Sequence, residues 1–288
     1  MRILIIGPKS EENISLVNAG QKRNHQVKLV SLHQISLLVQ ANKMKAYVSG
    51  QELADYDVCL FRGISPYFAK AKTVANFLKL RGTEVFDRKI YSKAFGYGKM
   101  FMTFEFFQKG LPCIDTFHFS TFEELNKYLV KIPRPVLIKD IAGMHSRNIY
   151  SFQTKKGLEQ FFLKRKKKVK QFLIQKKLNA NYYYRVLVVG DKVLGSMKRM
   201  SYFNPQRKST PLAKRSVRVE KNKEIESLAL QAARATHTDI AGVDIIYDGD
   251  NPKIQEVNRS PKFGRFTEVM NVDVAQEIIK YLEKFNKI

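Results

Sequence analysis

Two short strands near the C-terminal end are predicted to form a hairpin that carries two carboxylates. Val243–Tyr247 is rich in β-branched and aromatic residues, and Lys253–Asn258 has the composition of a second strand. The residues between them, Asp-Gly-Asp-Asn-Pro, are typical of a turn. A hairpin that is symmetric about the middle of this turn places Asp244 opposite Glu256. Because two facing carboxylates repel each other, this pairing favours a bound cation.

A third polar side chain belongs to the same face of the hairpin. Side chains alternate along a strand, so Asn258 points to the same side as Glu256. Two carboxylates and an amide oxygen are donors that a hard divalent cation prefers, and Mg²⁺ usually keeps water and substrate phosphates as its other ligands. A solvated hairpin with charged side chains in water is the alternative interpretation, and spacing alone does not decide between the two.

The net charge of the chain favours acidic partners. Its 288 residues include 51 Lys and Arg against 26 Asp and Glu, which gives a formal charge of +25. Such an excess steers nucleic acid, a ribosomal surface, ATP or a polyglutamate tail toward the protein. A lysine-rich bias of the whole proteome would produce the same number without any acidic partner.

Composition and cysteine usage predict a cytoplasmic globular protein. The chain is 44% hydrophobic and 27% charged, and no apolar run approaches the ~18 residues that span a bilayer. Arg2–Ile6 is too short for the apolar part of a signal peptide. Cys59 and Cys113 have no C-x-x-C spacing and no nearby His, so we expect reduced cysteines in the protein core and no membrane association.

The first 90 residues alternate between strands and helices, and this pattern predicts a doubly wound parallel sheet. The expected strands are Arg2–Ile6, Gln26–Ser31, Tyr56–Phe61 and Glu84–Asp87, and the expected helices are Glu11–Lys22 and Pro66–Leu80. No G-x-G-x-x-G occurs in this region, so nothing in it indicates a dinucleotide.

The remaining residues have an α+β pattern with antiparallel character. An apolar-rich helix begins at Lys99 and ends at Lys109-Gly110. The expected strands that follow are a short one from Asp115, then Val136–Ile141, Asn148–Phe152, Val169–Gln175, Tyr182–Val189 and Lys192–Met200. The expected helices are Thr121–Val130, Lys155–Phe162, Glu224–Thr236 and one capped by Asp273, and Pro205–Arg218 is expected to be a loop.

The motif AGVDII followed by QEVNRSP resembles the metal-binding end of ATP-grasp ligases, in the RimK-like group that includes the ribosomal-protein S6 glutamate ligase. The resemblance implies a pre-ATP-grasp α/β domain over residues 1–90, before an ATP-grasp core of two α+β subdomains. These would be a central lid subdomain over 91–176 and a C-terminal metal-binding subdomain over 177–288. The implied cofactors are ATP and Mg²⁺, with Mn²⁺ as a substitute.

The resemblance also assigns roles to individual residues. Metal ligands would be Asp244, Glu256 and Asn258. ATP would be held by Lys99, Lys139, His145, Ser146 and Gln175. Arg185 and Arg199 would face the acyl phosphate, and Arg207, Arg259 and Lys262 would bind the substrate.

Four departures from the family pattern bear on these roles. The loop 142–147 keeps one glycine where relatives have several to cradle the triphosphate. Lys176 stands where the family usually has an acidic residue, and Tyr183 stands where it has an aspartate. The family's glycine pair is missing from Pro205–Arg218. We expect cationic side chains to replace the missing backbone contacts to phosphate.

The resemblance implies a carboxylate–amine ligase that activates a carboxylate as an acyl phosphate and then joins it to an amine. The expected substrates are an acidic amino acid, most plausibly glutamate, and a peptide, protein terminus or small-molecule acceptor. Two other interpretations stay open: an ATP-grasp binding protein with impaired turnover, and a basic RNA- or ribosome-associated factor. The sequence does not identify the acceptor, and it allows a homo-oligomer without requiring one.

Overall fold

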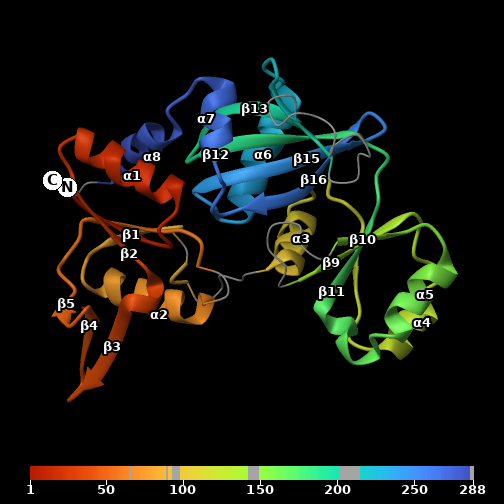
Figure 1. The fold of residues 1–288 in the computed structure, drawn as a ribbon, viewed down its shortest axis with the longest axis horizontal. Coiled ribbons are helices and arrows are strands. Elements are labelled where there is room, and N and C mark those ends of the chain that lie inside the picture. The colour runs from red at the N-terminus through yellow and green to blue at the C-terminus, as the bar shows by residue number, and fades with distance from the viewer. Residues whose placement is uncertain (65–66, 89, 93–97, 142–148, 202–214, 286–288) are drawn as a thin grey trace.

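The computed structural model of the chain describes residues 1–64, 67–88, 90–92, 98–141, 149–201 and 215–285. Within them the chain forms an N-terminal domain, a lid and a C-terminal subdomain, which lie side by side in Figure 1. Helix α3 lies centrally, under the C-terminal sheet. No described helix is long and apolar enough to cross a membrane.

The N-terminal domain is a parallel four-stranded sheet in the order β2-β1-β6-β7, which confirms the predicted doubly wound architecture. Its elements are β1 (Arg2–Ile6), α1 (Glu11–Lys22), β2 (Gln26–Val30), η1 (Leu32–Gln34), β6 (Val58–Phe61), α2 (Phe68–Leu80) and β7 (Glu84–Phe86). Ser10 caps α1 by accepting a hydrogen bond from the Asn13 amide, and acidic residues occupy the first turn of that helix. α1 packs on one face of the sheet and α2 on the other.

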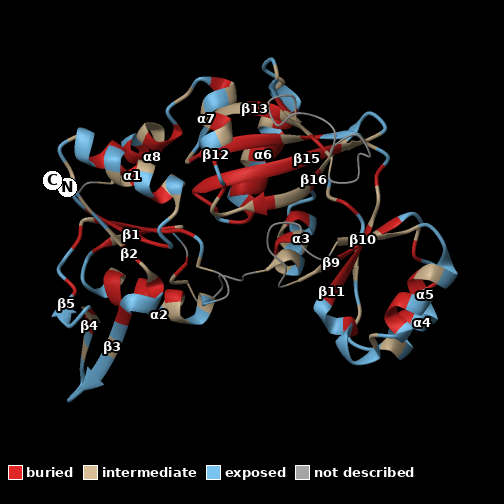
Figure 2. Ribbon diagram, viewed as in Figure 1, coloured by how far each residue is buried: buried red, intermediate tan, exposed pale blue. Residues whose placement is uncertain are grey.

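A small antiparallel sheet extends from this domain, although the sequence pattern predicts no element there. It consists of β3 (Ile35–Gln40), β4 (Lys43–Val48) and β5 (Gln51–Glu52). The tight turn at Ala41-Asn42 has positive φ at both residues, and such a turn matches the twist of a hairpin. The strands project into solvent, where Leu38 and Val39 are exposed (Figure 2). The strands escaped prediction because their alternation between apolar and polar residues is weak.

The lid is an antiparallel sheet in the order β10-β9-β11-β8 with two helices packed on it, in agreement with the predicted α+β pattern. Its elements are β8 (Thr116–His118), α4 (Phe122–Tyr128), β9 (Val136–Asp140), β10 (Ile149–Phe152), α5 (Lys155–Leu163), η2 (Lys166–Gln171) and β11 (Phe172–Lys176). The predicted start of the last strand at Val169 is wrong. Val169 lies in a short 3-10 helix that buries its side chain in the lid core.

The C-terminal subdomain is built on a five-stranded antiparallel sheet in the order β14-β13-β12-β15-β16. Its elements are β12 (Tyr182–Val189), β13 (Lys192–Met200), β14 (Ser216–Arg218), α6 (Lys223–Ala235), β15 (Ile240–Asp248), β16 (Asn251–Asn258), α7 (Gly264–Met270) and α8 (Val274–Glu283). Residues 216–218, predicted as loop, form an edge strand, and α7 was not predicted. α6 packs on one face of the sheet and α7 on the other.

Two helices pack outside the region that contains their neighbours in sequence. α3 (Lys99–Gln108) precedes the lid but inserts Met102 and Phe106 into the core of the C-terminal sheet. α8 ends the chain and packs against α1, with Ile278 and Ile279 in one core with Ile3 of the N-terminal sheet. This shared core joins the N-terminal domain and the C-terminal subdomain into a single unit. Both cysteines are free, and Cys59 is buried while Cys113 is half-buried.

Candidate active site

The predicted pair of carboxylates faces each other across β15 and β16, but the hairpin reaches this register in an unexpected way. The turn contains only Gly249 and Asp250, and Ile254 pairs with Ile245 rather than with Ile246, its partner in a symmetric hairpin. A β-bulge then inserts one extra residue and restores the pairing of Asp244 with Glu256.

The bulge also sets which side chains face the core. Ile254 and Val257 are three residues apart, yet both are buried in the apolar core on one face of the sheet. A regular strand would send them to opposite faces. With the bulge, Glu256 and Asn258 lie on the face of Asp244, and the Asn258 side-chain nitrogen is 3.4 Å from Asp244 Oδ2. The three side chains therefore lie on one face of the hairpin, and their role as metal ligands stays a prediction.

Arg185 extends this polar row across the sheet. It pairs with Asp244 in the register of β12 and β15, and its guanidinium binds the Asp244 carboxylate with two hydrogen bonds, one of them 2.8 Å long between Nη2 and Oδ2. Arg185 is 7% exposed and Asp244 is 3% exposed, so water screens this ion pair little. A cation, two carboxylates and an amide therefore stand together on three adjacent strands.

Two lysines from other parts of the chain complete the cluster. Lys139 lies on β9 of the lid and is 8% exposed, and burial lowers the pKa of its ammonium while nearby Glu256 raises it. Lys99 begins α3 and donates a 2.9 Å hydrogen bond to the backbone carbonyl of Asp140. Burial, followed by the charge of Asp244, raises the pKa of the Glu256 carboxyl, and Lys139 and Lys99 oppose this rise. Three cations thus surround two carboxylates whose mutual repulsion is otherwise uncompensated.

A cavity of about 150 Å³ lies beside Lys139, between the lid and the hairpin. Leu137 and Gln175 line it from the lid, and Ile246 and Gln255 line it from β15 and β16. Gln175 donates a 2.9 Å hydrogen bond to the Thr116 hydroxyl, whereas its side-chain oxygen is buried and has no partner among the described residues. A buried acceptor without a donor costs free energy, so a bound group with an N–H would stabilise this site.

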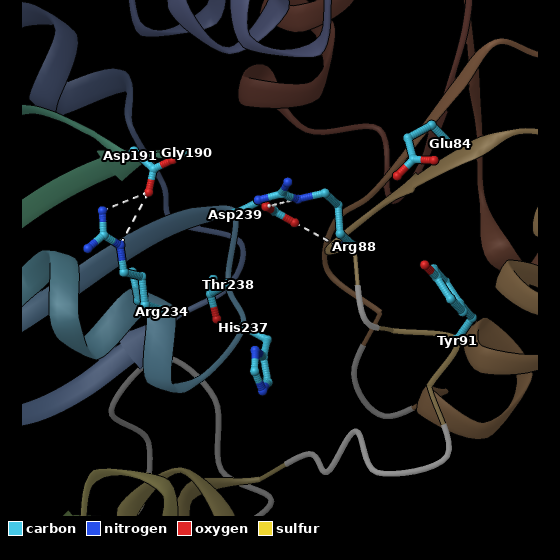
Figure 3. Close-up of a pocket in the computed structure, with 10 residues that line it drawn as sticks. Glu84, Arg88, Tyr91, Gly190, Asp191, Arg234, His237, Thr238 and Asp239 are labelled. Carbon is cyan, nitrogen blue, oxygen red and sulfur yellow. Dashed lines mark hydrogen bonds and ion pairs between the residues drawn. The ribbon is translucent and has the colours of Figure 1, made fainter. Parts of the chain in front are cut away.

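A larger cavity of about 430 Å³ lies elsewhere, between the N-terminal domain and the C-terminal subdomain (Figure 3). Its arginines already have partners: Arg88 binds Asp239 at 2.8 Å and Arg234 binds Asp191 at 2.9 Å. Its lining includes neither of the facing carboxylates and neither Lys99 nor Lys139. We therefore place the candidate site beside the smaller cavity, which Lys139 and Gln175 line and which lies next to the strands that carry the facing carboxylates.

The other predicted site residues have different surroundings. Arg199 lies over the ring of Tyr183 at 5.7 Å, and Lys262 is exposed. Arg259 binds Asp87 of the N-terminal domain at 2.8 Å and also donates to backbone carbonyls, so its guanidinium is already occupied. Its predicted contact with a substrate carboxylate stays a prediction. His145, Ser146 and Arg207 lie outside the described residues.

The prediction missed polar residues that follow the N-terminal strands. Arg62 directly follows β6 and Asp87 directly follows β7, and both contact the segment after the metal ligands. Carboxyl ends of parallel strands are where open α/β sheets bind ligands, so this position was the available signal.

Comparison with known families identifies this arrangement. A family model described as RimK-like ATP-grasp domain matches residues 108–282, and one described as RimK PreATP-grasp domain matches residues 1–84. The chain belongs to the RimK-like ATP-grasp family. It is therefore an ATP-grasp carboxylate–amine ligase that uses ATP and a divalent metal ion, in agreement with the prediction from its sequence.

Relatives of this RimK-like ATP-grasp protein match along nearly all of its length. The "Probable alpha-L-glutamate ligase" of Vibrio vulnificus is 26% identical and covers 99% of this chain and 96% of its own. A protein with the same name from Picosynechococcus sp. is 25% identical with the same coverage.

Solved structures show the same fold. The ATP-grasp ligase PsnB, complexed with the precursor peptide PsnA2 and AMPPNP, superposes with a TM-score of 0.75 at 18% identity, covering 99% of this chain and 98% of that one. The D-cycloserine synthetase DcsG superposes with a TM-score of 0.72 at 10% identity over the full length of both chains.

The residues of this RimK-like site fit the cofactors of the family. The two carboxylates and the amide of the hairpin match the oxygen donors that Mg²⁺ prefers. Among the described residues no group of three or more His, Cys, Asp or Glu forms a metal cluster, so any Mg²⁺ here would depend on phosphate or water for its other ligands. The unpartnered oxygen of Gln175 could accept from the amino group of adenine.

Proposed function

We propose that this ligase adds glutamate or a similar acidic amino acid to a peptide, a protein terminus or a small acceptor at the expense of ATP. The observation that carries the proposal is the row of Arg185, Asp244 and Glu256 on three adjacent strands, with Lys139 of the lid beside it. The names of the relatives and the net charge of +25 support an acidic substrate.

Each member of the site has a separate part in this proposal. Asp244, Glu256 and Asn258 would hold Mg²⁺, and Gln175 would orient adenine in the cavity between the lid and the hairpin. Mg²⁺–ATP, when bound, supplies the phosphoryl group that activates the carboxylate substrate and the positive charge that stabilises its transfer.

The basic residues act on the substrates. Lys99 and Lys139 would neutralise phosphate charge, and the burial of Lys139 would strengthen its attraction because little water screens it. Arg185 and Arg199 would stabilise negative charge on the substrate side. Arg259 and Lys262 are further candidates for binding the substrate carboxylate.

Replacing Glu256 by Gln tests the proposal. The change keeps the size of the side chain but removes one negative charge from the metal site. We expect ADP release with Mg²⁺–ATP, measured over a panel of amino acids with mass spectrometry of the acceptor, to fall at least about 100-fold. The metal-free protein should melt at the same or a slightly higher temperature, because one of two repelling carboxylates is gone. The extra stability conferred by Mg²⁺–ATP should disappear.

The exposed Glu268 offers the matched control, since Glu268→Gln makes the same chemical change away from the site. It should leave both readouts at their wild-type values. Turnover of ATP by Glu256→Gln at the parental rate would reduce Glu256 to a charged hairpin residue and end the ligase assignment of this site.

The basic run of the lid supports a second candidate, an acidic macromolecular partner such as RNA. Lys164, Lys167 and Lys168 are exposed and form no ion pair within the described chain. Unpaired surface cations bind polyanions with a steep dependence on salt. Binding of a single-stranded RNA that weakens sharply between low and physiological salt, and that is lost when these lysines become Gln, would favour this function.

A further inference from the structure

The segment that follows the metal ligands is tied to the N-terminal domain at three consecutive residues. Arg62 Nη2 donates to the Pro261 carbonyl at 2.9 Å, and the Gly63 amide donates to the Ser260 hydroxyl at 2.7 Å. Arg259 Nη1 lies 2.8 Å from the Asp87 carboxylate. All three bonds come from the carboxyl edge of one parallel sheet, because Arg62 and Gly63 follow β6 and Asp87 follows β7.

The same edge holds the beginning of β15. The Asp239 amide donates to Asp87 at 2.9 Å, and Arg88 binds the Asp239 carboxylate through both its backbone amide and its side chain (Figure 3). The hairpin is thus tied to the N-terminal domain at both of its outer ends, before Asp244 and after Asn258.

Arg62 is an unusual residue for such an interface. It is 4% exposed, and burial lowers the pKa of its guanidinium to about 10. Its hydrogen bonds go to neutral acceptors, the Asn13 amide oxygen and the Pro261 carbonyl, both at 2.9 Å, and Nη1 has no partner among the described residues. The charges of Glu12 and Asp87 oppose this lowering of the pKa, and the guanidinium lies over the Phe263 ring at 5.4 Å, but no carboxylate among the described residues accepts a hydrogen bond from it. Burying such a charge is costly, and an apolar side chain of the same size often gives equal or greater stability. The arrangement therefore calls for a reason other than stability.

Pro261 connects Arg62 to the site. A Cβ added to Gly242 would lie 2.8 Å from Pro261 Cβ and 3.2 Å from Arg185 Nη1, so Pro261 and the guanidinium of Arg185 both pack on this glycine. The Gly242 carbonyl also accepts a 3.2 Å hydrogen bond from Asn258. A shift of Pro261 would consequently move Arg185 and Asn258 relative to Asp244.

We propose that Arg62 is a positioning residue for the metal ligands: it fixes the backbone at Pro261 and thereby sets where Asn258 and Arg185 stand beside Asp244. The inference rests on the metal role proposed for Asp244, Glu256 and Asn258. In this arrangement the N-terminal domain sets the geometry of the metal site, as outer hydrogen-bond partners do in metal sites generally.

Arg62→Met tests the inference, because it keeps most of the volume and removes both the charge and the hydrogen bonds. Binding of ADP is measured by calorimetry with Mg²⁺ and with a chelator. We expect affinity in the presence of Mg²⁺ to fall about 10- to 100-fold, while affinity in the chelator stays at the wild-type value because the cavity beside Gln175 is unchanged. Without ligand, the melting temperature should be unchanged or higher. A purely structural role would instead lower the melting temperature and weaken both affinities together.

Two further variants make the outcome decisive. Arg81→Met removes an exposed arginine elsewhere in the N-terminal domain, where it pairs with Asp55, and should leave Mg²⁺–ADP affinity unchanged. Ser260→Ala removes the acceptor of the Gly63 amide and should weaken Mg²⁺–ADP binding in the same direction as Arg62→Met, by a smaller factor. If Arg62→Met does not fold, the Mg²⁺–ADP affinity of Ser260→Ala tests whether the N-terminal domain positions the segment after the metal ligands.

Wild-type Mg²⁺–ADP affinity in Arg62→Met, or in Ser260→Ala if Arg62→Met does not fold, would overturn the positioning role. Absence of Mg²⁺–ADP binding by the wild-type protein would instead overturn the proposed function, so the two failures are distinguishable.

Discussion

The C-terminal subdomain contacts the N-terminal domain through a shared hydrophobic core, whereas it contacts the lid mainly through polar groups and a cavity. Ile3 and Leu60 of the first domain pack in one cluster with Ile278, Ile279 and Leu282 of α8. The buried members of the lid core, by contrast, all lie between residues 125 and 174. Figure 2 shows the lid core as a red patch of its own, apart from those of the other two regions.

Among the described residues, polar contacts join the lid to the rest of the chain. Lys99 donates to the Asp140 carbonyl, and Lys176 at the end of β11 binds Asp248 at the end of β15 at 2.9 Å. A small apolar cluster that includes Ile114 and Ile246 lies nearby. Polar contacts that water can replace open more readily than a shared core. We therefore expect the lid to be the part that moves when ATP enters, while the N-terminal domain and the C-terminal subdomain stay together.

The largest expected difference is in the labelling of the two cysteines, because one lies in the N-terminal core and the other where the chain enters the lid. Cys59 is buried in the N-terminal sheet, and Cys113 lies half-buried where the chain enters the lid and pairs with Ile254. Burial raises the pKa of both thiols. Labelling of Cys59 by a thiol reagent should require global unfolding, which has a free energy of about 5–15 kcal/mol. Cys113 should react through a local opening that has a smaller free energy. The labelling rates are measured by mass spectrometry and compared with those of the unfolded chain. Equal protection of the two thiols would contradict the expectation that the lid opens locally while the N-terminal core stays closed.

Removing a large side chain from the lid core should destabilise the lid alone. Phe162 is 1% exposed, and Phe162→Ala should cost the lid about 3–5 kcal/mol. Limited proteolysis should then cleave within residues 116–176, while the main melting transition of the remaining protein changes little. Leu163 is 50% exposed, so Leu163→Ala is the neighbouring control and should have little effect. A fall of the main transition in Phe162→Ala would show that the lid does not unfold separately.

The corresponding change in the shared core should lower the main transition. Ile279 is fully buried, and Ile279→Ala should destabilise the unit formed by the two joined regions by about 2–5 kcal/mol in denaturant unfolding. Ile14→Ala makes the same change at an isoleucine that is 39% exposed on α1 and should be nearly neutral. Separate transitions for the N- and C-terminal regions in Ile279→Ala would mean that their cores are independent.

The smallest expected effect is on the pH dependence of stability, and it comes from Glu283 at the interface between the N-terminal domain and the C-terminal subdomain. Glu283 of α8 binds Arg23 at 2.6 Å and His25 at 2.7 Å, and the Arg23 hydrogen bonds lower the pKa of Glu283 to about 2, below its ordinary value of 4.5. Its contribution to stability is thus present above pH 4.5 and lost as the pH falls from there toward 2. Glu283→Gln should flatten the stability profile in that window. An unchanged profile would show that the pair adds nothing to this interface.

The sequence by itself determined many of the local elements and the facing pair of carboxylates on the C-terminal hairpin. The helix Glu11–Lys22 was predicted with the bounds that the structure has, because a serine cap, acidic residues in the first turn and apolar periodicity all act within a few residues. The pairing of Asp244 with Glu256 was also predictable, since turn composition and strand length limit the register of a hairpin. The route to that register, a two-residue turn followed by a bulge, was not.

Tertiary structure alone decided what the charged side chains bind and where the end helices pack. Arg259 was expected at the substrate but pairs with Asp87, and α8 covers the N-terminal sheet although more than 180 residues separate it from β7. A buried charge takes the nearest opposite charge in a low-dielectric interior, and which group is nearest depends on the packing of distant segments. Local sequence carries the periodicity of an element but not the identity of its partner across the molecule.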